Sequence, residues 1–268
     1  MSEENKAQIL PKVSVVITTV LPKNKKYLDA CVASVRGLDY PKDRLEVLVV
    51  TPDFSPEPTL SKARNYGISK TDPTSKYVFL LHDDVIVPKD SLLNLVNIAG
   101  DNQIILTGIS PSQDQFDHCL GYNFVIDGTN YQVDGGKTSM NEELEKKHLP
   151  AFGRARSPYP FGMYFVEQIP MFAVLIPRTV LSTVGEFDES LQGISDDVDY
   201  SWRARDKGVR MAVLLDTFLW HFGSASAEAR TPKQQYEGWS HFRSKYGRLP
   251  PYIDEGLVAD AKKAAGLP

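Results

Sequence analysis

The sequence has little of what several protein classes require. Its 268 residues include two cysteines, Cys31 and Cys119, too few for a disulfide framework or a four-cysteine zinc site. No apolar run approaches the roughly 18 to 20 residues of a membrane-spanning helix. The N-terminus from Met1 to Lys12 is polar and has no signal-peptide core. We therefore expect a cytoplasmic protein whose contact with a membrane, where it has one, is peripheral and on the cytosolic face.

Two nucleotide-binding signatures are also missing. The sequence has no G-x-G-x-x-G fingerprint and no G-x-x-x-x-G-K-[ST] loop, which argues against simple Rossmann dehydrogenases and P-loop NTPases. It has no excess of positive charge either, because 30 Lys and Arg against 34 Asp and Glu give a net charge of −4. A general attraction for nucleic acid is therefore not expected. With 42% hydrophobic and 24% charged residues, the composition is that of a globular domain.

Strand and helix patterns alternate along the first part of the chain. Val13–Thr19 and Leu45–Val50 are apolar, mostly β-branched or aliphatic runs, typical of buried parallel strands. Between them, apolar residues three and four apart from Tyr27 to Leu38 predict a helix. Further strands are predicted at 77–81 and 104–107, with helices at 60–68 and from Pro88. This order predicts an α/β fold with a mostly parallel sheet and helices on both faces.

The middle of the chain is different. Residues 111–168 are rich in Gly, Pro, Asn and aromatics and have no sustained period, which we interpret as loops and short strands over an active site. Regular patterns then predict strands at 171–176 and 209–215, and helices from Pro177, at 196–207 and at 236–246. The tail after Pro250 is expected to pack across the surface or fray. We expect a tail at 1–12, one domain at 13–224 with halves 13–110 and 111–224, and a helical extension at 225–268.

Acidic residues follow the third predicted strand. His82-Asp83-Asp84 stand at its carboxyl end, where open α/β sheets bind ligands. Adjacent carboxylates there suit a hard cation such as Mg²⁺ or Mn²⁺. Alternatively, Asp83 and Asp84 cap the helix after Pro88.

Three further groups each allow two interpretations. The first group follows Ser195, a residue type common at helix N-caps, and comprises Asp196, Asp197 and Asp199. An ionised aspartate there could be a general base. Alternatively, these acids only stabilise the amino end of the helix. His221 could ligate a metal or be a buried hydrogen-bonding group. Arg64, in Ala-Arg-Asn-Tyr-Gly, could bind a phosphate or pair with an acid.

The order of these segments resembles that of the family 2 glycosyltransferases of the GT-A fold, from about Val13 to Ser224. Val184–Glu189 looks like the family's V-G-G-F-D-E segment, Asp196–Asp199 looks like its E-D-x-D motif, and Arg203–Gly208 matches the R-x-x-x-x-G that follows. The resemblance implies a single GT-A domain. It also implies a hexosyl- or related transferase that moves a sugar from a nucleotide-diphosphate sugar to a hydroxyl of a glycan or glycolipid, usually with inversion.

The resemblance also assigns roles to residues. Asp197 takes the place of the catalytic base, and Asp84 and His221 that of ligands to Mn²⁺ or Mg²⁺. His82 stands at the first acid of the family's metal motif and is counted with them. The donor side would comprise Thr18, Thr19, Asp53, Arg64 and Asp83. Thr51–Ser55 departs from the two acids usual after the second strand, so no nucleotide is predicted.

Two other functions remain open from the sequence. His82 and the altered Thr51–Ser55 segment would suit a non-catalytic carbohydrate or nucleotide-sugar binding module. A sugar nucleotidyltransferase would need a glycine-rich basic loop after the first strand, and Val20–Lys26 has no glycine. Two sets of residues are candidates for contact with the acceptor. Six aromatic residues could stack on sugar rings or could form a small core of the insertion itself (Tyr122, Phe124, Tyr131, Tyr159, Phe161, Tyr164). Five basic residues near the C-terminus could bind an anionic surface or could form a solvated face (Arg230, Lys233, Arg243, Lys245, Arg248).

Overall fold

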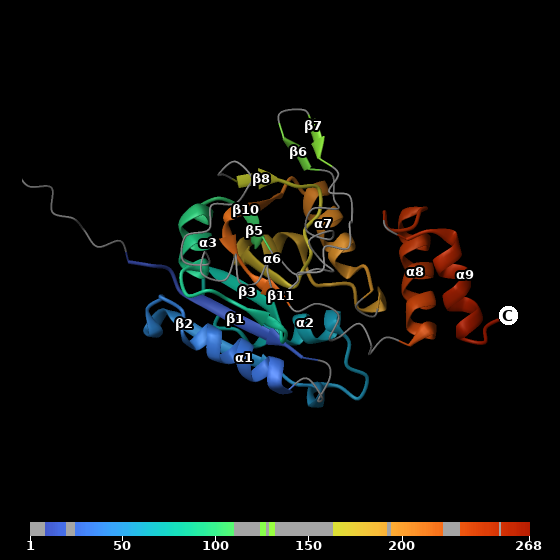
Figure 1. The fold of residues 1–268 in the computed structure, drawn as a ribbon, viewed down its shortest axis with the longest axis horizontal. Coiled ribbons are helices and arrows are strands. Elements are labelled where there is room, and N and C mark those ends of the chain that lie inside the picture. The colour runs from blue at the N-terminus through green and yellow to red at the C-terminus, as the bar shows by residue number, and fades with distance from the viewer. Residues whose placement is uncertain are drawn as a thin grey trace, which may run out of the picture.

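The computed structural model describes residues 9–19, 25–109, 124–126, 129–131, 163–191, 194–221, 231–251 and 253–268. Its centre is a seven-stranded sheet in the order β2-β1-β3-β9-β5-β10-β8 (Figure 1). The strands are β1 (Val13–Thr18), β2 (Leu45–Val50), β3 (Tyr77–His82), β5 (Ile104–Ile109), β8 (Met163–Phe165), β9 (Ala173–Pro177) and β10 (Arg210–Phe218). The predicted strands are all present, with ends shifted by up to three residues.

The sheet is mixed but mostly parallel. β1 pairs parallel with β2 and β3, and β10 pairs parallel with β5. β9 lies antiparallel between β3 and β5, and β8 lies antiparallel to β10. The carboxyl ends of β1, β2 and β3 therefore meet at one edge, where Thr18 is paired with His82.

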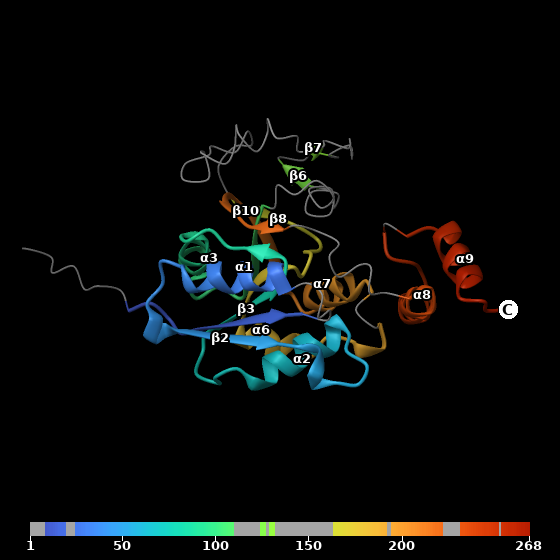
Figure 2. The same ribbon diagram turned by 60° about the horizontal axis from the view of Figure 1, so that its bottom comes forward.

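Helices cover both faces of the sheet (Figure 2). On one face lie α1 (Lys25–Arg36) and α3 (Ser91–Ala99), and on the other lie α2 (Leu60–Lys70), α6 (Arg178–Val184) and α7 (Asp196–Asp206). The alternation of side chains along β1 explains this arrangement. Val15 and Ile17 are buried in the cluster of α1 and α3, whereas Val16 is buried in the cluster of α2, α6 and α7.

Helix α2 lies unusually close to the sheet. A Cβ at Gly67 would come within 2.4 Å of Cγ1 of Val16 and 3.0 Å of Cγ2 of Val50. The helix starts at Thr59, whose side chain accepts a hydrogen bond from the Lys62 amide, as expected of an N-cap. This close approach fixes the helix turn that carries Arg64.

Two C-terminal helices, α8 (Pro232–Tyr246) and α9 (Glu255–Ala264), lie at one end of the molecule (Figure 1). Phe242 and Tyr246 of α8 pack against Trp202 of α7. The tail after Pro250, which was expected to pack across the surface or to fray, packs: it forms α9, which lies against α8 and buries Val258 and Ala261. Asp254 caps α9 by accepting from the Leu257 amide at 2.8 Å, a signal present in the sequence.

Several boundaries and short elements differ from the prediction. Helix α3 begins at Ser91 rather than Pro88, because Pro88 closes a turn with Ser91 before the helix. β4 (Val85–Ile86) and β11 (Trp220–His221) form a small antiparallel ladder that was not predicted. The other short elements are β6 (Phe124–Ile126), β7 (Thr129–Tyr131), η2 (Lys42–Arg44), η3 (Pro52–Phe54) and η5 (Glu189–Leu191).

Most of the segment 111–168 lies outside the described residues, as do Cys119, Tyr122, Tyr159, Phe161 and Arg230. The stacking role of the six aromatics therefore stays a prediction. The basic residues of α8 have partners within the protein: Lys245 pairs with Asp188 and Asp199, and Arg243 pairs with Glu255. Within the described ranges, no helix is long and apolar enough to cross a membrane.

Candidate functional site

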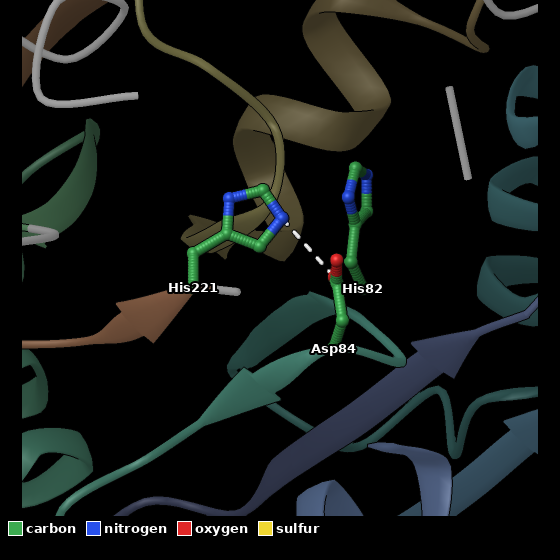
Figure 3. Close-up of side chains that lie close together, drawn as sticks. All are labelled: His82, Asp84 and His221. Atoms are coloured by element: carbon green, nitrogen blue, oxygen red, sulfur yellow. Dashed lines mark ion pairs between the residues drawn. The ribbon is translucent and has the colours of Figure 1, made fainter. Parts of the chain in front are cut away.

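Three side chains predicted as metal ligands meet at the carboxyl edge of the sheet. His82 ends β3, Asp84 lies in the turn before β4, and His221 lies in β11, which pairs with β4. Potential ligand atoms of these residues all lie within 4.8 Å of one another. Figure 3 shows the two imidazole rings and the Asp84 carboxylate converging. The β4–β11 ladder thus brings His221 to acids more than a hundred residues away in the sequence.

Asp84 is the centre of this group. It is 1% exposed, and its Oδ1 lies 3.1 Å from Nε2 of His221. Burial tends to raise the pKa of this carboxyl, but the neighbouring His221 imidazole outweighs burial, so its pKa lies below the ordinary value. From the described residues, no hydrogen bond of good geometry reaches either carboxylate oxygen. Buried oxygens in this condition fit a bound cation.

The ring of His221 is held by an aromatic neighbour that the sequence analysis missed. Phe172 stacks on it with centroids 4.5 Å apart and an interplanar angle of 9°. This stacking keeps Nε2 directed at Asp84 (Figure 3). The available signal was an aromatic residue directly before a buried strand, which is common in cores and carries no information about a site.

Asp83 lies beside the cluster and is also buried, at 3% exposure. Burial raises its pKa to about 6; the Asp84 charge acts in the same direction, and a hydrogen bond from the Thr19 side chain opposes it. Thr18 donates to the carbonyl of Leu81 at 3.2 Å, which joins the ends of β1 and β3. The alternative that these acids cap α3 is wrong, because the N-cap residue of that helix is Asp90.

Arg64 lies between two predicted motifs. Its guanidinium donates to Oδ2 of Asp196, to Nε2 of His82 at 2.9 Å and to the carbonyl of Met171 at 3.2 Å. Ser61 donates to the same Asp196 oxygen at 2.9 Å. Both charged side chains are buried, at 3% and 5% exposure. The structure therefore shows the acid pairing that was one of the two interpretations of Arg64.

The next residue of α2 also holds a predicted motif. The Asn65 amide donates to the carbonyl of Phe187 at 2.9 Å and to Glu189 at 3.0 Å, and it accepts from the Phe187 amide at 2.8 Å. The adjacent residues Arg64 and Asn65 thus anchor both acidic segments of the second half, 186–189 and 196–199, to one helix. These contacts span more than a hundred residues, so residue spacing alone could not predict them.

The acidic motif at the start of α7 contains three different environments. Asp196 is in the ion pair with Arg64. Asp199 is fully buried and binds Arg203 of its own helix at 2.8 Å, and Tyr246 and Lys245 of α8 at 2.7 and 2.6 Å. Asp197 is half-buried between these two fully buried acids.

The backbone just before this motif is unusual. Ser195 precedes α7 with a φ of 55° and makes no side-chain cap bond to the helix. It is the one non-glycine among the described residues with a positive φ. Such a conformation costs about 1–2 kcal/mol and often occurs at functional sites.

Asp53, predicted on the donor side, is exposed in η3 beyond the carboxyl end of β2. The Thr51 hydroxyl lies 3.4 Å from its Oδ2. Phe54 stacks on Tyr66 of α2 with centroids 5.3 Å apart. The segment therefore stands at the same edge of the sheet as Thr18, next to β1.

Comparisons with known proteins agree with this architecture. The sequence profile of the family described as "Glycosyltransferase like family 2" matches residues 7–237. A comparison with curated proteins gives no match.

Solved structures of glycosyltransferases share the fold. S. aureus TarS has a TM-score of 0.54 at 14% identity, over 95% of this chain and 42% of that chain. GalNAc-T7 with UDP, GalNAc and Mn²⁺ has a TM-score of 0.55 at 15% identity, over 97% and 55%. The mannosyltransferase PcManGT from Pyrobaculum calidifontis, in complex with GDP-Man and Mn²⁺, has a TM-score of 0.53 at 15% identity, over 95% and 70%. The chain thus spans about half the length of the first two.

Proposed function

The chain belongs to the Glycosyltransferase like family 2, and we propose that it transfers a sugar from a nucleotide-diphosphate sugar to a hydroxyl acceptor. One observation carries the proposal: the buried Asp84 carboxylate lies beside Nε2 of His221 at the carboxyl edge of the sheet. In open α/β sheets this edge binds the ligand. Structural neighbours with the same fold are described with UDP-GlcNAc, or with GDP-Man and Mn²⁺.

The residues at this edge fit a divalent cation. Asp84 offers carboxylate oxygens that lack directed hydrogen bonds from described residues, and His221 offers an imidazole nitrogen. This mixed donor set suits Mn²⁺, and Mg²⁺ less closely. When bound, the metal would offset the negative charge that develops on the leaving diphosphate. His82, predicted as a third ligand, lies within the same group.

We assign the role of general base to Asp197. The amino end of α7 favours the ionised form of a carboxylate, which can take the proton from the attacking hydroxyl. Its neighbours Asp196 and Asp199 are buried in ion pairs, whereas Asp197 is only half-buried and can be reached by an acceptor. One attacking group on the face opposite the leaving diphosphate inverts the anomeric carbon.

The remaining assignments are proposals of the same kind. Thr18, Thr19 and Asp83 would contact the donor at the ends of β1 and β3, and Asp53 would contact it at the end of β2. The acceptor would be a glycan or glycolipid met by the segment 111–168, in a domain that spans 13–224. We expect this reaction in the cytosol or at the cytosolic face of a membrane.

The base is tested by Asp197→Asn, with UDP-GlcNAc and GDP-mannose as donors and Mn²⁺ present. We expect the rate of sugar release or transfer to fall by about 10²-fold or more, because general-base catalysis contributes about that much. UDP affinity should stay within a few-fold. Asp206→Asn is the matched control, since Asp206 is an exposed acid at the other end of α7. Full activity in Asp197→Asn would remove it as the base.

A non-catalytic binding module of the same fold is the second candidate. The observation that favours it is the bond from Arg64 to Nε2 of His82. His82 stands where the family's metal motif has its first acid, and this bond engages its side chain within the protein. Binding of nucleotide sugars without turnover across a broad acceptor panel would support this candidate. A single glycosidic product would exclude it.

A further inference from the structure

One buried side chain connects the two halves of the proposed active site. Arg64 of α2 contacts His82, two residues from the proposed metal ligand Asp84, and Asp196, the neighbour of the proposed base Asp197. Its third contact is the carbonyl of Met171, the residue before Phe172. We propose that Arg64 is a positioning residue, which holds His82 outside the metal's ligand set and fixes the start of α7. This inference rests on the proposed function.

The bond to His82 has a fixed direction. A guanidinium has only donors, so Nε2 of His82 must accept the bond of 2.9 Å from Arg64. A neutral imidazole has one nitrogen lone pair in its plane, and this bond occupies it. The other nitrogen then carries the proton and has no lone pair for a cation. The side chains that would hold the metal are therefore Asp84 and His221.

The bond to Asp196 acts on the opposite side. Arg64 and Ser61, both on α2, bind the same oxygen of Asp196. This carboxylate belongs to the first residue of α7 and directly follows Ser195, whose φ is positive. The ion pair thus fixes the orientation of the first helical turn, which carries Asp197. Because α2 itself packs closely against β1 at Gly67, the ion pair fixes the position of the first turn of α7 relative to the central sheet.

The same geometry argues against direct binding of the donor by Arg64. Its side chain is 3% exposed, and both terminal nitrogens are committed: NH1 to Asp196, and NH2 to His82 and Met171. The guanidinium also lies 5.1 Å above the Phe187 ring. A phosphate would have to replace buried charge-assisted bonds that hold two segments together. A lysine at this position has one ammonium group and could not span both partners.

The first test measures binding of Mn²⁺ alone, by titration calorimetry or by loss of the free-ion EPR signal. His82→Gln keeps an acceptor for Arg64, and its dissociation constant should stay within about threefold of that of the wild type. Asp84→Asn and His221→Gln should each weaken binding by tenfold or more. Equal weakening in His82→Gln would overturn the exclusion of His82. If none of the three substitutions changes the Mn²⁺ dissociation constant, the metal site of the proposed function is contradicted, and not only the exclusion of His82.

The second test separates positioning from donor binding. We expect Arg64→Lys and Asp196→Asn to lower turnover of UDP-GlcNAc or GDP-mannose by about 10- to 100-fold, since small misplacements cost about that much. Affinity for UDP or GDP with Mn²⁺ should stay within about threefold. The double variant should be no slower than the slower single variant, because both changes break one link.

The matched control is Arg178→Lys, which changes an arginine bound to Ser75, Thr71 and Asp72 at the opposite edge of the sheet. Its turnover should stay within a few-fold of that of the wild type, which separates positioning from a general loss of structure.

If Arg64→Lys fails to fold, the pair is replaced together by Arg64→Met with Asp196→Leu, which leaves no buried charge unpaired. Nucleotide affinity that falls tenfold in Arg64→Lys but not in Asp196→Asn would overturn the proposal and make Arg64 a donor ligand. This affinity can be measured even where no acceptor gives turnover.

Discussion

Three aspartates within four residues of α7 lie in three different environments. The residues alone predict that an acid at this helix start could be a base, and only the resemblance to the family names Asp197. The contacts that distinguish its two neighbours are with Arg64, 132 residues from Asp196, and with Tyr246, 47 residues from Asp199. Such contacts depend on how helices pack, and residue spacing within one segment has no information about them. In contrast, the Asp84–His221 pair was anticipated, because the resemblance to the family implies that both residues are ligands of one metal.

The backbone at Ser195 gives a prediction for a single residue. Ser195→Gly and Ser195→Ala both remove the hydroxyl, so the difference between them isolates the backbone effect. Glycine adopts a φ of 55° without steric cost, whereas alanine does not. We expect the glycine variant to be the more stable one by about 1 kcal/mol in urea unfolding. Equal stability of the two variants would show that the left-handed turn carries no strain.

At the scale of elements, periodicity predicted most helices and strands, and capping chemistry was underused. β2 has the bounds that were predicted, because its apolar run is short and flanked by turn residues. Helix α9 lies in the expected helical extension, but its bounds were not predicted, although Asp254 provides an N-cap. The β4–β11 ladder was missed because two strands of two residues have no detectable period. This ladder brings His221 to Asp84, so the missed element is one that builds the candidate site.

Helix α8 is held to the core by charges, which predicts how stability depends on pH. Asp188 accepts from Lys245 at 2.7 Å and from Ser190, and Nε2 of His241 lies 3.4 Å away. Burial opposes the charged form of this carboxylate, but the Lys245 bond outweighs burial, and the pKa of Asp188 is lowered. A lowered pKa in the folded state contributes stability that is present above the unfolded value of about 4 and is lost as the pH falls.

Asp188→Asn should therefore cost about 1 to 3 kcal/mol of unfolding free energy at pH 7. The difference from the wild type should shrink as the pH falls below about 4. Urea unfolding at pH 7, 4, 3 and 2 measures it, because the loss falls below the unfolded pKa of about 4. Asp39→Asn is the control, because Asp39 is exposed and lies 3.7 Å from Lys89, and such surface pairs contribute little. A difference for Asp188→Asn that does not change with pH would argue against the ion pair as its cause.

At the scale of the whole molecule, the alternation of strands and helices predicted the fold class but not the order of the strands. β9 runs against β3 and β5 in the middle of the sheet, yet its sequence Ala-Val-Leu-Ile-Pro has the composition of a parallel strand. Direction is set by the connections, and the segment that precedes β9 had no readable pattern. The result matters for the site because the reversed strand begins next to Phe172, which stacks on His221.

The proposed cation site joins Asp84 of the first half to His221 of the second, so occupancy should stabilise the whole chain. A ligand at one hundred times its dissociation constant adds about 2.7 kcal/mol to the folded state. At about 2–4 °C per kcal/mol for a chain of this size, Mn²⁺ with UDP or GDP should raise the Tm by about 5 to 10 °C. Asp84→Asn should lose most of this shift relative to its own baseline, and the nucleotide with the larger shift identifies the donor. An equal shift in Asp84→Asn would mean that nucleotide binding does not depend on this carboxylate, and a metal role for Asp84 could not stand.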